Sequence, residues 1–550
     1  MMGKSPKQTG VSCPAPPGEG ETGKVGFARR ALRSPWVSRL VAPAVSAVAL
    51  FLAFPTAHLY PLAWVALVPL ILSCVHAGSK GAFFRFFFAG WLFHSLTLQW
   101  LWANIFWAGG WAVIGQQFLC VALALFWAAC GGVWAAGRRR WAFGGGLELA
   151  SLWWFMELGM ANLFTGFGWT ALGYTQGAVL PVAQWAAVGG VSLVSFLLMG
   201  VSAHLALAVC GKHRLLAGCA AVLLIVVAFS GGLLLREAPP PENAPVRAGI
   251  VQPMFSQEVK WDPHYARFLF DSLEDMTRAL GREGRMDLVV WPEAAVPDAL
   301  PAAEVDERLK ALAREMDCVL LTGYGRDDRA AGRSYNSLMA VAPDGAEPAS
   351  YDKVRLAAFG EYVPFGEYLP FLEAIAFGGV SAGEEQRLLP AAGQRVGPLI
   401  CFEVLFSGMS RSLRKMGADC LLVVTNLAWF GASNAVMQEL EIARFRAIES
   451  RLPLIHCSNT GISGVFDPFG RFHPVNMQYF SGGQVRAFDA ERFPVGAGMS
   501  RRLVGILDIP GKAAAYMAPW WGAALVFLSV LTLSLLWRRV RPSRGAGESV

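Results

Sequence analysis

The chain has 550 residues, of which 54% are hydrophobic and only 16% are charged, and its formal net charge is +7. A soluble globular protein carries about a quarter charged residues, so this composition excludes a purely soluble protein and indicates long apolar segments. The basic excess gathers beside those segments, which gives no reason to expect nucleic acid as a partner.

Eight apolar runs are candidate membrane spans, because about 20 apolar residues are needed to cross a bilayer. Seven of them lie at 39–56, 60–77, 87–103, 109–136, 146–163, 183–210 and 215–235. The eighth runs from Pro519 to Trp537 and has aromatic residues at both ends, as is typical of interfacial belts. The sequence therefore predicts a multi-pass α-helical membrane bundle of about eight spans.

Basic residues predict the orientation of this bundle, because they occur in every other loop. They are Arg29, Arg30, Arg33 and Arg39, then Lys80 and Arg85, then Arg138, Arg139 and Arg140, then Lys212, His213 and Arg214, and finally Arg538, Arg539, Arg541 and Arg544. The positive-inside rule places these loops and both termini in the cytoplasm. The long hydrophilic block between the seventh and eighth spans must then face outward.

These patterns divide the chain into five parts. We expect 1–38 to be a disordered cytoplasmic N-terminus and 39–237 to hold spans one to seven. An extracytoplasmic domain follows at 238–511, then span eight at 512–538 and a cytoplasmic tail at 539–550.

The outward block shows a different pattern, in which short β-branched runs alternate with amphipathic helical stretches. We expect strands at 246–251, 287–291, 318–322, 337–342, 396–401 and 420–425, and helices at 264–281, 302–316, 404–416 and 434–450. Such alternation predicts a single layered α/β domain.

Three residues with complementary chemistry follow β-prone segments of this block. Glu293 comes after Val289-Val290-Trp291-Pro292, Lys353 follows Tyr351-Asp352, and Cys401 ends the run Val396 to Ile400. Taken singly, a solvated acid, a surface lysine and an inert buried cysteine are the more common interpretations. Open α/β sheets, however, place ligands at the carboxyl ends of strands, where all three are expected.

Together these groups can perform acyl transfer through a thioester. A thiol becomes a nucleophile when a base or a cation favours its thiolate, and a carboxylate can take the thiol proton and return it to the leaving group. An ammonium near the attacked carbonyl stabilises the oxyanion, and the backbone N–H of Phe402 is a candidate second donor. His264, His456 and His473 show no metal-binding spacing, so we expect neither a metal nor a cofactor.

Ten cysteines are scattered without C-x-x-C spacing. Cys318, Cys401, Cys420 and Cys457 lie in the outward block, where an oxidising compartment would permit disulfides. The sequence does not determine any pairing, but a nucleophilic Cys401 must stay unpaired.

The motifs around the three residues resemble a known family. Trp291-Pro292-Glu293, Lys353 with Phe359-Gly360-Glu361-Tyr362, and Cys401-Phe402-Glu403 are similar to the Glu-Lys-Cys signature of the nitrilase, or carbon–nitrogen hydrolase, superfamily. Together with the predicted spans, the chain resembles the apolipoprotein N-acyltransferase family. Further similar motifs lie at 166–169, 172–174, 257–261, 426–431, 443–447 and 459–461.

Several positions depart from the pattern of that family. Arg355, Leu356, Ala357 and Ala358 precede Phe359 where the family usually has His-Leu-Val-Pro, and Phe402 replaces a common tyrosine. The other departures are Met160, Gly168, Leu427 and Glu439. None of them removes the three central residues, but they leave open a divergent paralogue with another amine acceptor.

The resemblance implies a bacterial inner-membrane enzyme with a periplasmic αββα catalytic domain. It implies a ping-pong reaction that moves an acyl chain from a membrane phospholipid to Cys401 and then to the α-amino group of the diacylglyceryl cysteine of an apolipoprotein. Glu293 would be the base and acid, Lys353 would hold the oxyanion, Glu361 would orient Lys353, and Glu403 would polarise the site. Trp261, Trp169, Phe365, Asn426 and Trp429 are the candidate substrate-binding residues, and the chain is expected to be a monomer.

Two alternatives belong to other classes of function. A membrane-anchored nitrilase-type amidase would use water as the second nucleophile, but it needs only one or two anchors. A transporter or non-catalytic assembly factor would need polar groups inside its bundle, and the apolar runs contain few.

Overall fold

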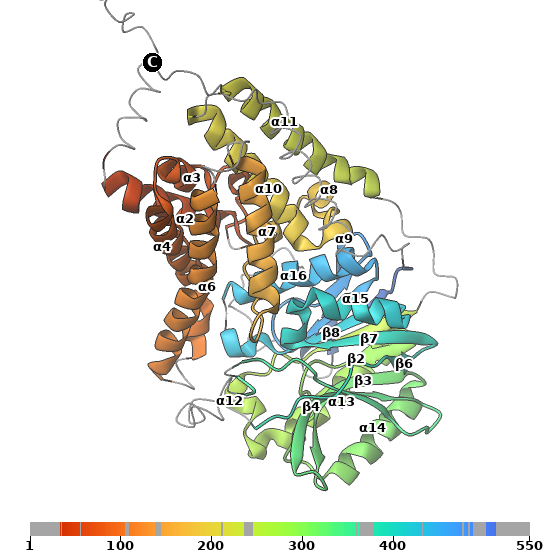
Figure 1. Ribbon diagram of the computed structural model, residues 1–550. Coiled ribbons are helices and arrows are strands. Elements are labelled where there is room, and N and C mark those ends of the chain that lie inside the picture. Colours follow the sequence, from red (N-terminus) through yellow and green to blue (C-terminus); the bar gives the residue numbers. More distant parts are fainter. Residues whose placement is uncertain are drawn as a thin grey trace, which may run out of the picture.

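The computed structural model describes residues 34, 36–55, 57–104, 109–137, 145–210, 213–235, 246–358, 360–362, 379–431, 433–475, 478–481, 484–487 and 502–512. In the strands between 478 and 508 it describes the backbone alone. The predicted N-terminal segment before residue 34, span eight at 512–538 beyond Lys512, and the tail at 539–550 lie outside the described residues. An α-helical part is followed along the chain by an α/β part (Figure 1).

The α-helical part contains long and short helices. They are η1 (Val37–Val41), α2 (Ala42–Ala53), η2 (Tyr60–Trp64), α3 (Val68–Cys74), α4 (Ser79–Thr97), η3 (Gln99–Asn104), α6 (Trp111–Gly137), α7 (Gly146–Asn162), η4 (Leu172–Gln176), α8 (Leu180–Ala183), α9 (Ala186–Gly189), α10 (Val191–Cys210), α11 (Arg214–Ser230) and η5 (Gly231–Leu234). Three helices in the described part are long and apolar enough to cross a membrane: Trp111–Gly137, Val191–Cys210 and Arg214–Leu234.

Several of the expected spans correspond to shorter or interrupted helices in the structure, whereas the run at 146–163 matches α7 (Gly146–Asn162). Val37–Ala53 and Tyr60–Cys74 are apolar but short. The expected run at 183–210 is divided between α9 and α10, because Gly190 adopts a φ of 72° that an L side chain rarely allows. The run at 87–103 falls on the end of α4 and on η3.

The α/β part contains two sheets. The eight-stranded sheet has the order β13 (Gln484–Ala487), β12 (Gln478–Ser481), β14 (Arg502–Asp508), β1 (Arg247–Gln252), β2 (Leu288–Val290), β3 (Val319–Asp328), β4 (Arg333–Val341), β5 (Ala349–Asp352). The six-stranded sheet has the order β11 (Phe472–Pro474), β10 (Gly464–Phe466), β9 (Leu454–Ser458), β8 (Cys420–Thr425), β7 (Gln394–Ile400), β6 (Leu389–Ala391). Strands β1, β2 and β3 pair in parallel, as do β7, β8 and β9.

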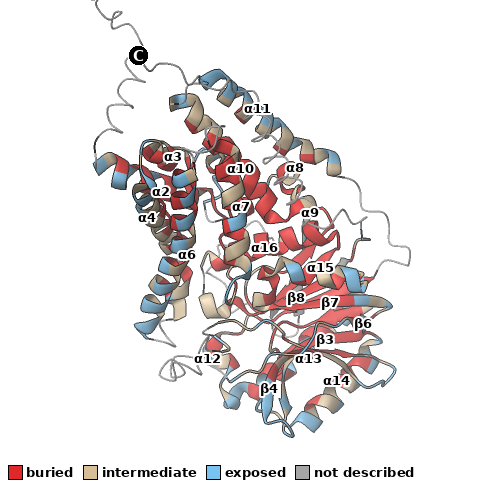
Figure 2. Cartoon of the chain, in the orientation of Figure 1, coloured by how far each residue is buried: buried red, intermediate tan, exposed pale blue. Residues whose placement is uncertain are grey.

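Helices connect the parallel strands and cover the outer faces of both sheets, since parallel neighbours need crossover connections. α13 (Ala266–Glu283) and α14 (Ala302–Met316) cover the first sheet, and α15 (Ser407–Met416) and α16 (Ala435–Ser450) cover the second. Val290, Ile400 and Val424 belong to the apolar cluster between the sheets. The predicted layered α/β domain is confirmed, with four layers in the order helix, sheet, sheet, helix (Figure 2).

The bundle and the α/β domain share one hydrophobic core. Phe445 of α16 belongs to the same buried cluster as Trp153 of α7 and Val194 of α10. Buried polar contacts join the two parts as well: Glu449 accepts a hydrogen bond of 2.9 Å from the backbone N–H of Val191. The bundle therefore covers α16, most of whose residues are buried, whereas the end of α15 stays exposed.

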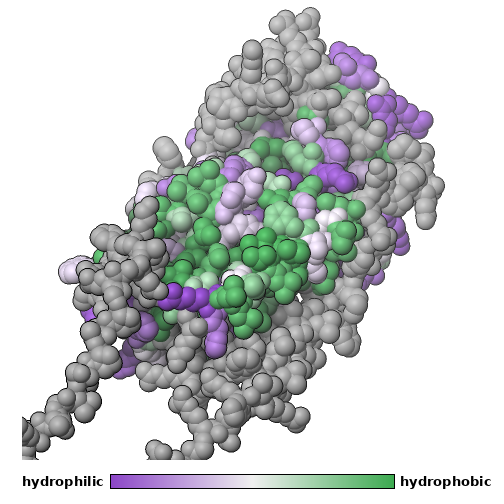
Figure 3. Space-filling model, turned by 90° about the horizontal axis from the view of Figure 1, so that it is seen from above, coloured by the Kyte–Doolittle hydropathy of each residue, from purple (hydrophilic) through white to green (hydrophobic). Residues whose placement is uncertain are grey.

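The opposite surface of the bundle is apolar and exposed. Viewed from the bundle end of the molecule, hydrophobic side chains dominate the described surface (Figure 3). On α11, Leu215, Leu223 and Val226 are more than half exposed. Extended apolar surface of this kind is typical of contact with lipid.

Candidate active site

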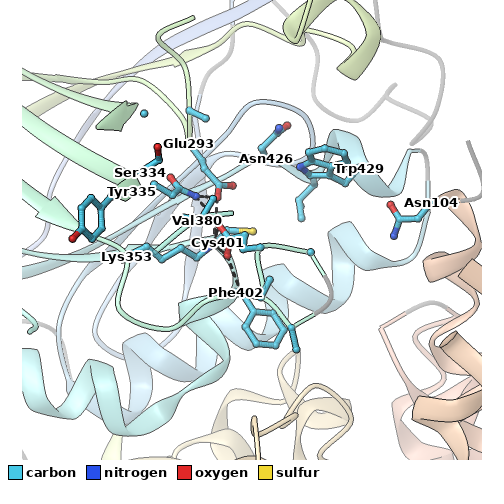
Figure 4. A pocket seen from close by; sticks show the side chains of 18 of the residues that line it. Asn104, Glu293, Ser334, Tyr335, Lys353, Val380, Cys401, Phe402, Asn426 and Trp429 are labelled. Atoms are coloured by element: carbon cyan, nitrogen blue, oxygen red, sulfur yellow. Dashed lines mark hydrogen bonds and ion pairs between the residues drawn. The ribbon is translucent and has the colours of Figure 1, made fainter. Parts of the chain in front are cut away.

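The three residues singled out in the sequence meet at one cavity. Glu293 lies just after β2, Lys353 directly follows β5, and Cys401 directly follows β7. All three line a cavity of about 2290 Å³, and their side chains converge in Figure 4. β2 and β5 belong to one sheet and β7 to the other, so the site lies where the ends of strands from the two sheets come together.

The backbone turns sharply at Cys401 and at the residue after Glu293. Cys401 has a φ of 50° and begins the short helix η8 (Cys401–Leu405), and Ala294 beside Glu293 has a φ of 46°. A left-handed conformation at a residue other than glycine costs on the order of 1–3 kcal/mol and persists where surrounding contacts enforce it. At Cys401 such a contact is the backbone N–H of Ile400, which donates a 2.8 Å hydrogen bond to Glu403.

Lys353 is held as a buried cation between two carboxylates. Its side chain is 1% exposed, and its Nζ lies 2.9 Å from the carboxylate of Glu361 and 3.5 Å from Oε1 of Glu293. Burial alone would lower the pKa of Lys353, but the charges of Glu361 and Glu293 outweigh it and raise that pKa. The ammonium in turn lowers the pKa of Glu361 against the effect of burial.

Asn336 of β4 binds both carboxylates that flank the lysine. Its Nδ2 lies 2.9 Å from Oε1 of Glu293 and 2.9 Å from Oε1 of Glu361. Its backbone carbonyl accepts a 2.8 Å hydrogen bond from the N–H of Lys353. Asn336 is not among the residues predicted from the sequence, because one amide inside a strand carries no signal of its own.

Lys260, the last residue of α12 (Gln257–Lys260), is a second buried cation at this site. Its Nζ donates a 2.9 Å hydrogen bond to the backbone carbonyl of Glu293. Burial lowers the pKa of Lys260 to about 8, although the charge of Glu293 opposes that change. The sequence offered a signal here, because Lys260 belongs to the 257–261 motif, in which only Trp261 was singled out.

Glu403 supports the site from outside the cavity wall. Its Oε1 accepts hydrogen bonds from Tyr351 Oη at 2.7 Å, from Val354 N at 2.8 Å and from Arg355 N at 3.0 Å. The chain segment that carries Lys353 is thereby tied to the segment that carries Cys401.

The thiol of Cys401 is held in its protonated form. Burial is the main cause of its raised pKa, and the charges of Glu293 and Glu439 add to it. The charge of Lys353 and a hydrogen bond with Thr425 act in the opposite direction. A nearby base is therefore needed to remove the proton when the sulfur reacts.

Comparisons with known proteins assign both parts of the chain to a family. The model of the carbon–nitrogen hydrolase family matches residues 248–487, and the model of the apolipoprotein N-acyltransferase N-terminal domain matches residues 46–204. An apolipoprotein N-acyltransferase of Geobacter metallireducens is 32% identical over 82% of this chain and 89% of its own length. One from Azotobacter vinelandii is 34% identical over 80% of this chain and 87% of its own length.

The chain belongs to the apolipoprotein N-acyltransferase family. It is therefore an acyltransferase whose α/β domain is of the carbon–nitrogen hydrolase type. Among solved structures, Nit3 of Saccharomyces cerevisiae, a member of branch 10 of the nitrilase superfamily, is 18% identical over 50% of this chain and 92% of its own, with a TM-score of 0.35.

Four aromatic residues named from the sequence line the cavity of this family member. They are Trp169, Trp261, Phe402 and Trp429. Trp261 is 44% exposed and lies 6.2 Å from Trp429 between ring centroids, whereas Trp169 is buried and donates a 2.7 Å hydrogen bond to Gln438. The rings thus form both the open and the closed parts of the cavity wall.

The two remaining candidates differ from these four. Asn426 lines the cavity, but its amide is occupied by neighbours: Asn459 donates to its Oδ1 at 2.8 Å, and its Nδ2 donates to Gln257 at 3.3 Å. Its contacts favour a role in shaping the turn that leads to Trp429. Phe365 lies outside the described residues.

The bundle supplies the other wall of the cavity. Trp111, Ile114 and Phe118 of α6 line it, and all three are at least 60% exposed. The cavity therefore joins the three reactive groups to an apolar surface of the bundle.

The cysteines of the described α/β part are free. Cys318, Cys420 and Cys457 are buried and Cys401 is partly exposed to the cavity. No disulfide removes the Cys401 thiol from the site within the described residues, as the nucleophilic role requires.

Proposed function

We propose that the chain moves an acyl chain from a membrane phospholipid, through a thioester on Cys401, to the α-amino group of the N-terminal diacylglyceryl cysteine of a lipoprotein. The observation that carries the proposal is the single cavity lined both by Glu293, Lys353 and Cys401 and by exposed apolar residues of α6. The names of the relatives support the same acceptor and the same reaction.

In the first half-reaction, Glu293 takes the proton of the Cys401 thiol and the sulfur attacks the ester carbonyl of the phospholipid. Lys353 stabilises the oxyanion, where one well-placed donor contributes about 10²–10³ in rate. The C–O bond of the ester then breaks, and Glu293 gives its proton to the departing lysophospholipid. The acyl group remains on Cys401 as a thioester.

In the second half-reaction, the neutral α-amino group of the lipoprotein attacks the thioester. Glu293 takes a proton from the attacking nitrogen, Lys353 again holds the oxyanion, and the C–S bond breaks. The proton then returns from Glu293 to the sulfur, which leaves an amide product and a Cys401 thiol.

Other residues hold these groups in place. Glu361 orients Lys353 through their 2.9 Å contact. Glu403 joins the Lys353 and Cys401 segments, so its contacts favour positioning of both residues over direct polarisation of the substrate. The backbone N–H of Phe402 serves as a second donor to the oxyanion.

The cavity allows both substrates to keep their acyl chains in apolar surroundings. Moving a chain into water costs about 0.8 kcal/mol per CH₂, so a site exposed only to water would bind lipid weakly. Trp169, Trp261 and Trp429 line the route between the bundle and the thiol, and Phe365 and Asn426 complete the proposed binding residues. A small-amide amidase would have no use for a cavity that reaches the lipid-facing helices.

We also propose the finer topology that the basic loops predict. Both termini are cytoplasmic, and 238–511 is a periplasmic domain between span seven and span eight of a monomer in the inner membrane. Arg214 begins α11 and the α/β part follows its other end, which supports placing that part opposite the basic loop. A reporter that works only in the periplasm should be active when fused after residue 235. A reporter that works only in the cytoplasm should be active when fused after residue 550. The reverse result would overturn this topology.

The acyl intermediate gives the direct test of function. Purified protein incubated with phospholipid should gain an acyl mass on the peptide that contains Cys401, and the adduct should disappear on addition of a diacylglyceryl-cysteine peptide. Cys401→Ala should show no adduct, and Lys353→Ala should abolish turnover while leaving the protein folded. An equal adduct on Cys401→Ala would overturn the proposal.

A further inference from the structure

Two further buried ionisable side chains, one of which lines the cavity with Cys401, have no part in the reaction as described so far. Glu439 is on α16 and His456 is on β9, and each is 1% exposed. Nε2 of His456 lies 3.5 Å from Oε2 of Glu439. Neither of these two atoms has a hydrogen-bond partner elsewhere among the described residues.

The hydrogen bonds of His456 determine how many protons this pair holds. Nδ1 of His456 lies 2.8 Å from the carbonyl oxygen of Ile462, and a carbonyl only accepts, so Nδ1 carries a proton. Nε2 of a neutral ring would then direct a lone pair at the carboxylate of Glu439. Two acceptors facing each other in a buried place are unfavourable, so a proton must lie between Nε2 and Oε2.

The pair is connected to the nucleophile by the hydroxyl of Thr425. Oγ1 of Thr425 donates a 2.9 Å hydrogen bond to Oε1 of Glu439. Ile400 and Val424 are partners in the parallel pairing of β7 and β8, so Thr425 is next to Cys401. The Thr425 side chain also lowers the pKa of Cys401 by hydrogen bonding, so its hydroxyl favours the thiolate.

We propose that Glu439 and His456 form a positioning pair that shares one proton, holds the Thr425 hydroxyl against Cys401, and keeps a net negative charge away from the nucleophile. This proposal rests on the proposed thioester function of Cys401. In the resting state, the thiol donates to Thr425 and Thr425 donates to Glu439. When Glu293 removes the thiol proton, the Thr425 hydroxyl turns to donate to the thiolate, and the proton shared with His456 stabilises the Glu439 carboxylate.

Other charges also act on Cys401 and set the background for this pair. Glu293, Lys353 and Lys260 face the thiol from the ends of β2, β5 and α12, and Glu361 acts on it through Lys353. Glu439 is the carboxylate on the α16 side, and its charge opposes the thiolate. Since His456 faces Glu439 from β9, loss of the imidazole should leave that charge uncompensated beside the sulfur.

The test measures the rate at which iodoacetamide alkylates Cys401 in the full-length protein as a function of pH, with the modified peptide quantified by mass spectrometry. His456→Leu should shift the midpoint of the pH profile upward by about one unit, the effect of one uncompensated like charge nearby. Glu439→Gln should leave the midpoint near that of the wild type, because an amide can donate to Nε2 of His456 and accept from Thr425.

The double variant with Glu439→Gln and His456→Leu separates this role from a purely structural one. Its midpoint should return to the wild-type value, since no charge is left to compensate. His473→Leu, which removes an exposed histidine on β11, is the matched control and should not move the midpoint. An unchanged midpoint in His456→Leu, or no return in the double variant, would overturn the proposal.

Folding of the variants is itself informative. If His456→Leu does not fold, the cause is expected to be the uncompensated carboxylate of Glu439. Adding Glu439→Gln should then restore a folded protein, and failure to restore it would also contradict the proposed pair. The assay is independent of lipid substrates. Absence of a phospholipid-derived thioester would therefore overturn the proposed function and leave the alkylation result standing.

Discussion

Glu403 accepts a 2.8 Å hydrogen bond from the backbone N–H of Val354, the residue next to Lys353. The same carboxylate accepts a 2.8 Å bond from the N–H of Ile400, the residue next to Cys401. One buried side chain thus holds together chain segments that leave two different sheets. This contact therefore helps to fix the position of Lys353 relative to Cys401.

Replacing that carboxylate should loosen both segments. Glu403→Gln places an NH₂ group against backbone N–H donors, and a buried donor without an acceptor costs about 1–3 kcal/mol. Burial raises the pKa of Glu403, whereas the hydrogen bonds from the surrounding backbone N–H groups act to lower it. We expect a lower Tm together with at least a tenfold loss in the rate of thioester formation, whereas Glu283→Gln, on the exposed end of α13, should change neither. A normal rate in Glu403→Gln would contradict the positioning role.

Asn336 should affect the rate more than the stability. Asn336→Leu removes the amide that binds both Glu293 and Glu361, so the base loses its fixed orientation. Misplacement of a catalytic group by about 1 Å can cost 10² in rate. We expect a loss of that size in the formation of the Cys401 thioester, measured by mass spectrometry over time. Ser334→Ala, on the same wall of the cavity, should retain the wild-type rate, and equal rates in the two variants would refute the role of Asn336.

The buried Lys260 should give the protein a recognisable pH dependence of stability. Its pKa is lowered by burial to about 8, below the ordinary value of roughly 10.4. Between these two values the unfolded chain still holds a proton that the folded protein has released, so stability rises with pH across this window. Below about pH 8 both states are protonated, and the folded state carries the cost of the buried ammonium.

Lys260→Met removes this contribution. The Tm of the wild type should therefore increase relative to the Tm of Lys260→Met as the pH rises from below 8 towards 10. Thermal unfolding at a series of pH values checks this difference, with Lys415→Met at an exposed position as the control. Parallel curves for the wild type and Lys260→Met would show that Lys260 keeps its proton throughout.

The wall of the cavity on α6 should matter for lipid substrates alone. Phe118→Arg places a charge on the surface that joins the cavity to the outside of the bundle. We expect at least a tenfold slower thioester formation with a long-chain phospholipid and an unchanged rate with a short, water-soluble ester, since only the long chain must cross this surface. Val133→Arg, exposed on α6 but absent from the cavity lining, is the matched control. Equal slowing with both esters would indicate a general disturbance of the protein.

Much of the α/β domain could be predicted from local patterns. The expected strand at 420–425 and helix at 302–316 are β8 and α14 with the same bounds, because a continuous apolar run and helical periodicity are properties of short segments. Glu293, Lys353 and Cys401 could be singled out for a similar reason, since each lies within three residues of the end of a strand. Their meeting at one cavity was an inference from chemistry, and the structure brings them to that cavity.

The remaining contacts depend on residues that are distant in the chain. Asn336, Lys260, Thr425 and His456 reach the site from four different elements, and no local pattern marks a single polar residue inside a strand or at the end of a short helix. Burial is the second reason. Lys353 resembles a surface lysine in the sequence, and only the packing of two sheets makes it a 1% exposed cation between carboxylates. The sequence by itself determined the reactive groups and the class of fold, whereas the tertiary structure decided which charges surround the thiol, because electrostatic interactions act through space and depend on burial.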